Sequence, residues 1–264
     1  MPRFKLTIEY AGTRYSGWQI QKNARTIQGE IDAAVREVTG RKDFELYGSG
    51  RTDAGVHAAA QVAHLDVSTS LSAQILVRRL NDELPSDIHI LSADVVPHRF
   101  HARHDAVARR YLYQLSRRRT AFAKAYVWWV KDSLDIERMQ QAAPAFVGRR
   151  DFRSFTASDD AEQAGSRSTV VVIDRVDIAE DGDLVLIAVE GSHFLWKMVR
   201  RIVGVLVEIG RGGLETDAAA RLVADLSDAP ARLTAPASGL FLQRVYYAHD
   251  KRDAVMRSLT PVVS

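Results

Sequence analysis

The 264-residue sequence contains no cysteine. That absence excludes disulfide bonds, a thiolate nucleophile and thiolate-bound zinc, and it is compatible with a reducing compartment. The sequence also lacks a long apolar run, because its most apolar window, residues 194–209, is short and carries four charged side chains. We therefore expect no segment that crosses a membrane. The first residues already read as a strand, so we expect no signal or transit peptide either.

The net charge is only +3, from 36 basic and 33 acidic side chains, but it is unevenly distributed. Residues 99–124 contain eight arginines or lysines and one acid, Asp105, which is a local excess of +7. Phe100, Tyr111 and Tyr113 lie among these cations. Concentrated positive charge with interleaved aromatic rings predicts a surface that binds a polyanion and stacks on its bases. A solvated basic face that binds nothing is the alternative.

Hydrophobic patterning predicts the elements of the first half. Alternating apolar and polar residues indicate strands, and apolar residues at helical spacing indicate helices. The expected strands are residues 4–10, 44–47, 56–67 and 88–96, and the expected helices are residues 72–80 and 26–38, the latter capped by Thr26. This order, β-α-β-β-α-β, is RRM-like.

The second half gives a similar succession of elements. The expected strands are residues 108–116, 126–130, 168–178, 184–190 and 239–247, and the expected helices are residues 136–147, 194–209 and 217–226. We therefore predict an α+β fold of two similar halves, residues 1–105 and residues 106–264. Their antiparallel sheets are expected to join into one extended sheet. A central active-site cleft flanked by helices is expected, which the second half completes.

The most informative stretch is Gly48–Ala58, which reads Gly-Ser-Gly-Arg-Thr-Asp-Ala-Gly-Val-His-Ala. Its three glycines admit positive φ and leave room for the backbone of another molecule. An aspartate can attack carbon to form a covalent ester, and Asp53 next to the cation Arg51 is expected to stay ionised. The spacing excludes a dinucleotide fingerprint and a phosphate-binding loop. An ordinary tight turn is the alternative.

This eleven-residue string resembles the catalytic signature of the TruA-type tRNA pseudouridine synthases. Further stretches are similar to other motifs of that family, in the same order along the chain: Glu9–Gln19, Thr26–Glu30, His98–Arg103, Ala108–Tyr113, Asp151–Phe155, Phe194–Gly204 and Ala235–Leu240. Two departures are visible. The family usually carries Asp where Ala11 stands, and it often has a proline and a bulkier residue where Ala235 and Ala237 stand.

The resemblance implies an enzyme that isomerises uridine to pseudouridine in the anticodon stem-loop of tRNA, at positions 38–40. Asp53 is then the nucleophile, and the uracil is detached, rotated and rejoined through C5. Attack at ribose C1′, a glycal route and attack on the uracil ring all remain open. Because the reaction is an isomerisation, we expect no cofactor and no metal.

The resemblance also implies roles for other residues. Arg51 is expected to splay out the target nucleotide or bind its phosphate, and Tyr111 to stack on the uracil. Arg200 is expected to pair with the catalytic carboxylate, and Leu240 to form an apolar wall of the pocket. The residues expected to bind RNA along the basic stretch are Arg103, Arg109 and Arg110.

Each role has a plainer alternative. Arg51 is a surface cation in that view, and Leu240 is a core residue. Tyr113 competes with Tyr111 for the stacking role, and Arg201 competes with Arg200 for the ion pair. The polar stripe that contains Arg200 on its predicted helix would then simply face water.

The three histidines at 98, 101 and 104 suggest a metal site. No cysteine accompanies them, however, and in an extended chain His101 would point to the opposite face from the other two.

The partners implied by the resemblance are tRNA, through its anticodon arm, and a second copy of the chain in a homodimer. A cytoplasmic location is expected. Two other functions compete: a catalytically silent RNA-binding or RNA-folding protein on the same scaffold, and a glycosidase, for which no second catalytic carboxylate stands out.

Overall fold

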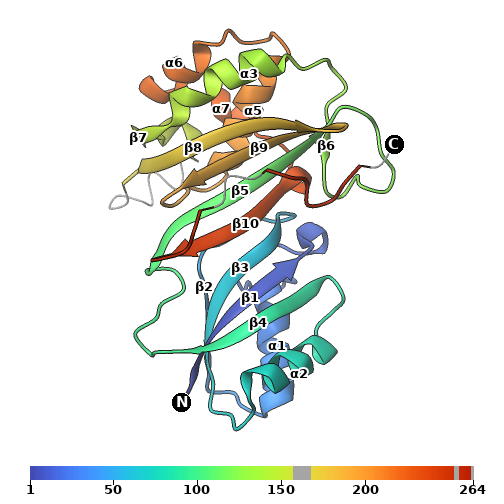
Figure 1. Cartoon of the computed structure of the whole chain (residues 1–264), viewed down its shortest axis with the longest axis vertical. Coiled ribbons are helices and arrows are strands. Elements are labelled where there is room, and N and C mark those ends of the chain that lie inside the picture. The colour runs from blue at the N-terminus through green and yellow to red at the C-terminus, as the bar shows by residue number, and fades with distance from the viewer. Residues whose placement is uncertain (157–167, 253–255, 263–264) are drawn as a thin grey trace. The chain divides into compact units, whose positions relative to one another are not determined.

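The computed structural model describes residues 1–156, 168–252 and 256–262 (Figure 1). The chain forms two compact units. The first consists of Met1–Val107 with Phe241–Arg252, and the second of Ala108–Leu240 with the residues that follow Arg252. Each unit combines helices with a mostly antiparallel sheet, which confirms the predicted α+β class. The predicted division into residues 1–105 and 106–264 stays a prediction.

The first unit has the predicted β-α-β-β-α-β order. Its elements are β1 (Arg3–Tyr10), α1 (Ile27–Thr39), β2 (Glu45–Gly48), β3 (His57–Asp66), α2 (Ala73–Glu83) and β4 (Ile88–Val96), followed by β10 (Leu240–Tyr247) from the other end of the chain. The sheet order is β4-β1-β3-β10, with β2 also paired to β3. Helices α1 and α2 cover one face of this sheet (Figure 1).

Local chemistry explains these elements. Alternate residues of β1, from Phe4 to Tyr10, are buried, so one face of the strand meets the core. Helix α1 begins where the Thr26 hydroxyl accepts a hydrogen bond from the Gly29 N–H at 3.2 Å. It ends at Gly40, whose φ of 65° is the left-handed conformation that glycine adopts without strain.

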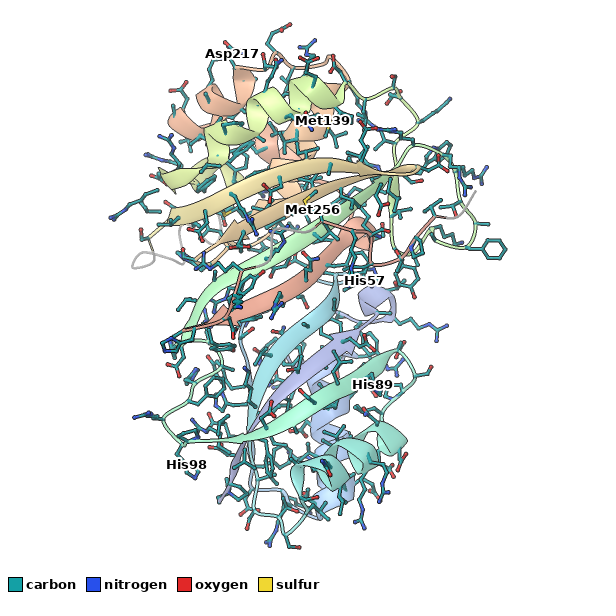
Figure 2. The ribbon with its side chains drawn as sticks, viewed as in Figure 1. His57, His89, His98, Met139, Asp217 and Met256 are labelled. Atoms are coloured by element: carbon teal, nitrogen blue, oxygen red, sulfur yellow. The ribbon has the colours of Figure 1, made fainter. Side chains whose placement is uncertain are left out.

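Strand β10 brings the C-terminal part of the chain into the first unit. It pairs with β3 in parallel, with Phe241 opposite His57 and Leu242 opposite Ala58. The His57 ring, labelled in Figure 2, stacks on the Phe241 ring with 4.8 Å between centroids. The first unit therefore contains a strand that lies more than a hundred residues away in sequence from its partner.

The second unit is a sheet with helices on one face (Figure 1). Its elements are β5 (Ala106–Ser116), β6 (Trp128–Trp129), α3 (Ile136–Ala142), β7 (Gly148–Asp151), β8 (Val170–Asp181), β9 (Leu184–Gly191), α5 (Met198–Gly210), α6 (Ala218–Ala224) and α7 (Ala229–Arg232). The sheet order is β5-β9-β8-β7, and β6 pairs with β5 in parallel. Strands β8 and β9 form an antiparallel hairpin, and Gly182 in its turn has a φ of 57°.

Four elements of the second unit differ clearly from the prediction. Helix α5 begins at Met198 instead of residue 194, because Lys197 has a left-handed φ of 58°. Helix α3 ends at Ala142, since Pro144 follows in a 3-10 turn and has no N–H to continue the helix. The predicted strand 126–130 shortens to β6, and the short strand β7 was not predicted.

The other face of the second sheet is covered by chain from two places. Leu112 and Leu186 form an apolar cluster there with Val127, and Met256 and Leu259 near the C-terminus pack against it (Met256 is labelled in Figure 2). Gln114 holds this segment on the sheet, because its Oε1 accepts a hydrogen bond from the Leu259 N–H at 2.7 Å.

Among the described residues, no helix has the length and apolar character needed to cross a membrane.

Candidate active site

The glycine-rich loop connects β2 to β3 and is fixed at its start by two residues of β3. The Ser49 N–H donates to the Val62 carbonyl at 2.7 Å, and the Ser49 hydroxyl donates to Oε1 of Gln61 at 2.7 Å. The Gln61 amide in turn donates to the Gly50 carbonyl at 3.0 Å. Gln61 is buried and was not among the predicted site residues. A fully polar side chain inside a predicted apolar strand was the available signal.

The opening motif of the chain packs around Asp53. The Trp18 N–H donates to the Thr52 carbonyl at 3.1 Å, and the Gly55 N–H donates to the Tyr15 carbonyl at 3.3 Å. The Tyr10 hydroxyl shares a 2.8 Å hydrogen bond with the Thr52 hydroxyl. Backbone on both sides of Asp53 is therefore held, and its side chain is half-buried. Two sequence motifs that lie some forty residues apart build one loop.

Two glycines of the opening motif make this packing possible. A Cβ on Gly12 would lie 1.9 Å from the Val56 carbonyl oxygen, and one on Gly17 would lie 2.5 Å from the Thr52 carbonyl oxygen. Both distances are far below van der Waals contact, so only glycine fits at either position. Backbone therefore approaches backbone directly at the loop that carries Asp53.

The three glycines of the signature serve different purposes. Gly55 adopts a φ of 79°, which confirms the positive φ expected of the string. Gly48 makes room for Trp18, because a Cβ there would lie 2.6 Å from the indole ring. Gly50 faces open space, with no atom within 4 Å of the position of its missing Cβ. Room for the backbone of another molecule, as the sequence predicts, exists at Gly50.

The first unit also brings Arg51 and Arg103 together. Both line a small pocket beside the loop, and the Arg51 Nε donates to Oε1 of Gln19 at 3.2 Å. Tyr47, which also lines the pocket, was not predicted as a site residue. Its position at the end of β2, immediately before the signature, was the signal that could have identified it.

Arg103 is presented by a turn that is firmly attached to the sheet. The neighbouring Ala102 N–H donates to Nδ1 of His64 at 3.2 Å, and the Ala102 carbonyl accepts from the Tyr247 hydroxyl at 2.7 Å. Arg3 on β1 donates to the His98 carbonyl at 2.6 Å. Arg103 is an exposed residue on this fixed base.

His64 is a buried base that cannot easily take a proton. Its side chain is 1% exposed, and burial, helped by the positive charge of Arg3, lowers its pKa to about 4. The neutral ring accepts the Ala102 hydrogen bond and stacks under Tyr47, with 5.8 Å between ring centroids. Protonation would place an unsolvated charge at this junction.

Acid should therefore destabilise the fold through His64. Its folded pKa lies below the unfolded value, so stability is complete above pH 6.5 and is lost as the pH falls toward 4. From these two pKa values we expect the free energy of unfolding to fall by about 2 kcal/mol between pH 7 and pH 5. Urea unfolding across this range measures the loss. His64→Asn, which keeps an acceptor for Ala102, should remove most of it, whereas the same change at exposed His89 (Figure 2) should not.

In the second unit, Tyr111 and Tyr113 have different environments. Tyr113 is fully buried and donates its hydroxyl hydrogen bond to the Pro236 carbonyl at 2.7 Å. Burial raises its pKa well above the ordinary tyrosine value, opposed in part by the charge of Arg200. Tyr111 is only half-buried and meets the ring of Phe194 edge-on at 5.2 Å. Of the two, Tyr111 is the ring with accessible surface.

Arg200 lies near the N-terminus of α5 and is tied to the segment after α7. Its Nε donates to the Ala235 carbonyl at 2.7 Å, and the Ala235 N–H donates to the Arg200 carbonyl at 3.0 Å. Arg201 is only 6% exposed, and burial, with the charge of Arg200, lowers its pKa. Leu240, at the start of β10, is buried. On the predicted polar stripe of α5, Arg201 is therefore buried, whereas Arg200 is half-buried.

The two arginines of β5 are held by the strand beside them. Arg109 donates to the Ser192 carbonyl at 2.8 Å. Arg110 forms an ion pair with Glu190 at 3.3 Å, and both side chains are 2% exposed. An RNA phosphate would have to compete with this buried carboxylate, so an RNA contact of Arg110 stays a prediction that its burial disfavours.

Acidic side chains of β8 and of the turn that precedes β9 also neutralise part of the predicted basic stretch. Arg117 pairs with Glu180, and Arg118 pairs with Asp183 at 2.6 Å. The local excess of +7 therefore overstates the positive surface that these residues present. This neutralisation depends on which strands are neighbours in the sheet, and the local sequence does not determine that.

The histidines contact one another without an arrangement suited to a metal. The rings of His101 and His104 lie 4.2 Å apart, and Nδ1 of His101 accepts from the Arg103 N–H at 3.1 Å. No group of three or more potential metal-binding side chains is found in the described parts of the chain.

Comparison with known proteins identifies the family. A sequence profile described as tRNA pseudouridine synthase matches residues 6–105 and 142–248. The chain belongs to the tRNA pseudouridine synthase family. It is therefore an isomerase that converts uridine in tRNA to pseudouridine.

Relatives of this tRNA pseudouridine synthase cover nearly its whole length, and each is named tRNA pseudouridine synthase A. The protein from Geotalea uraniireducens (strain Rf4) is 43% identical over 249 residues, which are 94% of this chain and 100% of that one. The protein from Rhodopseudomonas palustris (strain BisA53) is 40% identical over 94% of this chain and 100% of its own. The protein from Ligilactobacillus salivarius (strain UCC118) is 38% identical over 93% and 96%.

One departure of this synthase from the family pattern has a visible structural setting. Ala11 occupies the N-cap position of a 3-10 turn, Gly12–Arg14, and its backbone N–H donates to the Asp87 carbonyl at 2.9 Å. Its methyl group supplies no side-chain cap. The aspartate that the family usually carries here is a favoured capping residue, whereas Ala11 has no side-chain oxygen with which to cap the turn.

Proposed function

We propose that this synthase modifies uridines in the anticodon stem-loop of tRNA, at positions 38–40, and that Asp53 is its nucleophile. The observation that carries the proposal is the Asp53 loop. Backbone is held on both sides of a half-buried carboxylate, so the carboxylate is positioned before a substrate arrives. The anticodon arm comes from the family resemblance of the sequence.

The reaction needs no external reagent. The bond between N1 of uracil and C1′ of ribose breaks, and a bond between C5 and C1′ forms. The C5 proton leaves, and N1 is protonated. Asp53 acts through attack at C1′, through a glycal, or through attack on the uracil ring, and we expect neither cofactor nor metal. In each route the base must leave its stack to reach the carboxylate.

The proposed roles of the other residues follow the resemblance. Arg51 splays out the nucleotide or binds its phosphate, and Tyr111 stacks on the uracil and offers a hydroxyl for proton transfer. Arg200 keeps the carboxylate ionised, and Leu240 forms an apolar wall. Arg103, Arg109 and Arg110 bind RNA, with Arg103 best supported because it is an exposed residue. A homodimer and a cytoplasmic location are proposed on the same basis.

The test uses purified protein, unmodified tRNA transcripts, no added cofactor and EDTA. Pseudouridine is mapped by its chemical adducts. We expect conversion in the anticodon arm at positions 38–40. Conversion confined to another arm would contradict the proposed target. Binding without conversion, with or without added metal, would contradict the enzymatic proposal and favour a silent RNA-binding protein.

A further inference from the structure

The small pocket beside the Asp53 loop has a chemistry of its own. It has a volume of about 40 Å³ and is lined in part by Gln19, Tyr47, Gly50, Arg51 and Arg103. None of its lining residues is acidic. This volume admits a small group such as a phosphate and is too little to enclose a nucleobase. Two guanidiniums at an opening of that size favour a phosphate.

Tyr47 supplies an aromatic surface at the edge of this pocket. Its side chain is 37% exposed. The ring stacks on the neutral ring of His64 and meets His101 edge-on, with 5.0 Å between centroids. These contacts hold one side of the ring in place and leave accessible surface on the rest. A rigid, partly exposed aromatic ring is the feature on which unpaired bases stack.

Gly50 allows a backbone to approach this surface. No atom lies within 4 Å of the position where its Cβ would be, although the chain around it is held by Gln61. Gly50 and Arg51 lie two or three residues before Asp53 in the same loop, which limits their Cα separation from it to about 10 Å. A ligand at this pocket is therefore close to the proposed nucleophile.

We propose that the pocket and Tyr47 form a subsite for one unpaired nucleotide of the tRNA next to the target uridine. Its phosphate lies between Arg51 and Arg103, and its base stacks on Tyr47. The proposal rests on the proposed function, because it takes Asp53 as the position of the target. The subsite holds a neighbour of the flipped uridine and so fixes which uridine reaches the carboxylate.

A cycle of paired protein and RNA changes tests the stacking contact. Unpaired nucleotides of the anticodon loop are replaced one at a time by abasic residues, and the dissociation constants are measured with wild type, Tyr47→Ala and Tyr47→Phe. Loss of one stacked base should weaken binding to wild type about tenfold at a single position. An abasic residue at that position should not weaken binding to Tyr47→Ala any further. It should weaken binding to Tyr47→Phe as much as it weakens binding to wild type. Equal losses in all three proteins at every position would overturn the proposal.

The phosphate contact has its own matched control. Arg103→Gln should reduce the salt dependence of tRNA binding by the equivalent of about one phosphate contact. Arg79→Gln removes the same charge from an exposed position on α2 and should leave that dependence unchanged. Equal slopes for the two variants would contradict a phosphate at Arg103.

Gly50→Ala gives a variant that disturbs no side chain of the pocket. Because its Cβ meets nothing in the free protein, unfolding should be unaffected, while tRNA binding weakens roughly tenfold through overpacking of the subsite. Unchanged binding would overturn the subsite. Mapping pseudouridine with the wild type in parallel separates the two proposals. If the wild type modifies the anticodon arm but Tyr47→Ala and the abasic residues weaken binding independently, only the subsite is contradicted. If the wild type modifies another arm or none, the proposed function is contradicted.

Discussion

Replacing Asp53 by asparagine should reduce pseudouridine formation to below about one thousandth of the wild-type rate, because the proposed nucleophile is lost. The change removes the charge and keeps the shape. The neighbouring backbone hydrogen bonds of Thr52 and Gly55 do not involve the carboxylate, so the loop should persist. Single-turnover assays with saturating enzyme measure the chemical step, and filter binding should give a dissociation constant within about threefold of the wild type.

Asp43→Asn is the matched control, since Asp43 is an exposed acid of the same unit. It should react at the wild-type rate. Conversion by Asp53→Asn at a rate near that of Asp43→Asn would mean that another residue is the nucleophile. An inactive Asp53→Asn that has also lost tRNA binding would point to a structural role instead, and thermal unfolding would distinguish that outcome.

Gly204→Ala should destabilise the second unit by about 3 kcal/mol or more. A Cβ on Gly204 in α5 would lie 1.6 Å from the Leu233 carbonyl oxygen and 2.7 Å from its carbon, and these are backbone atoms that cannot rotate away. Either α5 or the chain after α7 must shift. That chain includes Ala235, which Arg200 holds by two hydrogen bonds, so the shift reaches a proposed active-site residue.

Thermal unfolding measures this effect, with an expected drop of roughly 10 °C in the midpoint. Gly50→Ala is the same substitution in open space and should leave the midpoint within a degree or two or raise it slightly. A Gly204→Ala protein with the wild-type midpoint would show that the close approach of α5 to Leu233 does not exist in solution.

Much of the fold could be predicted from the sequence, because local patterning determines it. The alternation in β1 and the Thr26 cap of α1 gave element positions to within a few residues. The left-handed conformation of Lys197, and with it the start of α5, could not be predicted in this way, since nothing in the neighbouring sequence indicates it. The string around Asp53 identified the family because its residue types and spacing are specific, and the family profile agrees.

What the sequence could not supply were contacts between distant segments. Gly48 resembled a residue that leaves space for a ligand, yet it accommodates Trp18. Arg110 resembled a phosphate-binding cation, yet the cross-strand register places it opposite Glu190. Tyr47 was an unremarkable strand residue until its ring was seen on the edge of a pocket. In each case the decisive neighbour lies ten or more residues away, beyond the reach of periodicity.

The parallel pairing of β10 with β3 has a consequence for synthesis of the protein in the cell. Phe241 and Leu242 complete the edge of β3 from near the end of the chain, after Ala108–Leu240, the larger part of the second unit, has been made. At ordinary elongation speeds the ribosome needs roughly ten seconds or more to travel from β3 to β10. During that interval the edge of β3 at His57 has no β10 to pair with, and unpaired strand edges promote aggregation. The nascent chain is therefore most vulnerable before its final twenty or so residues emerge.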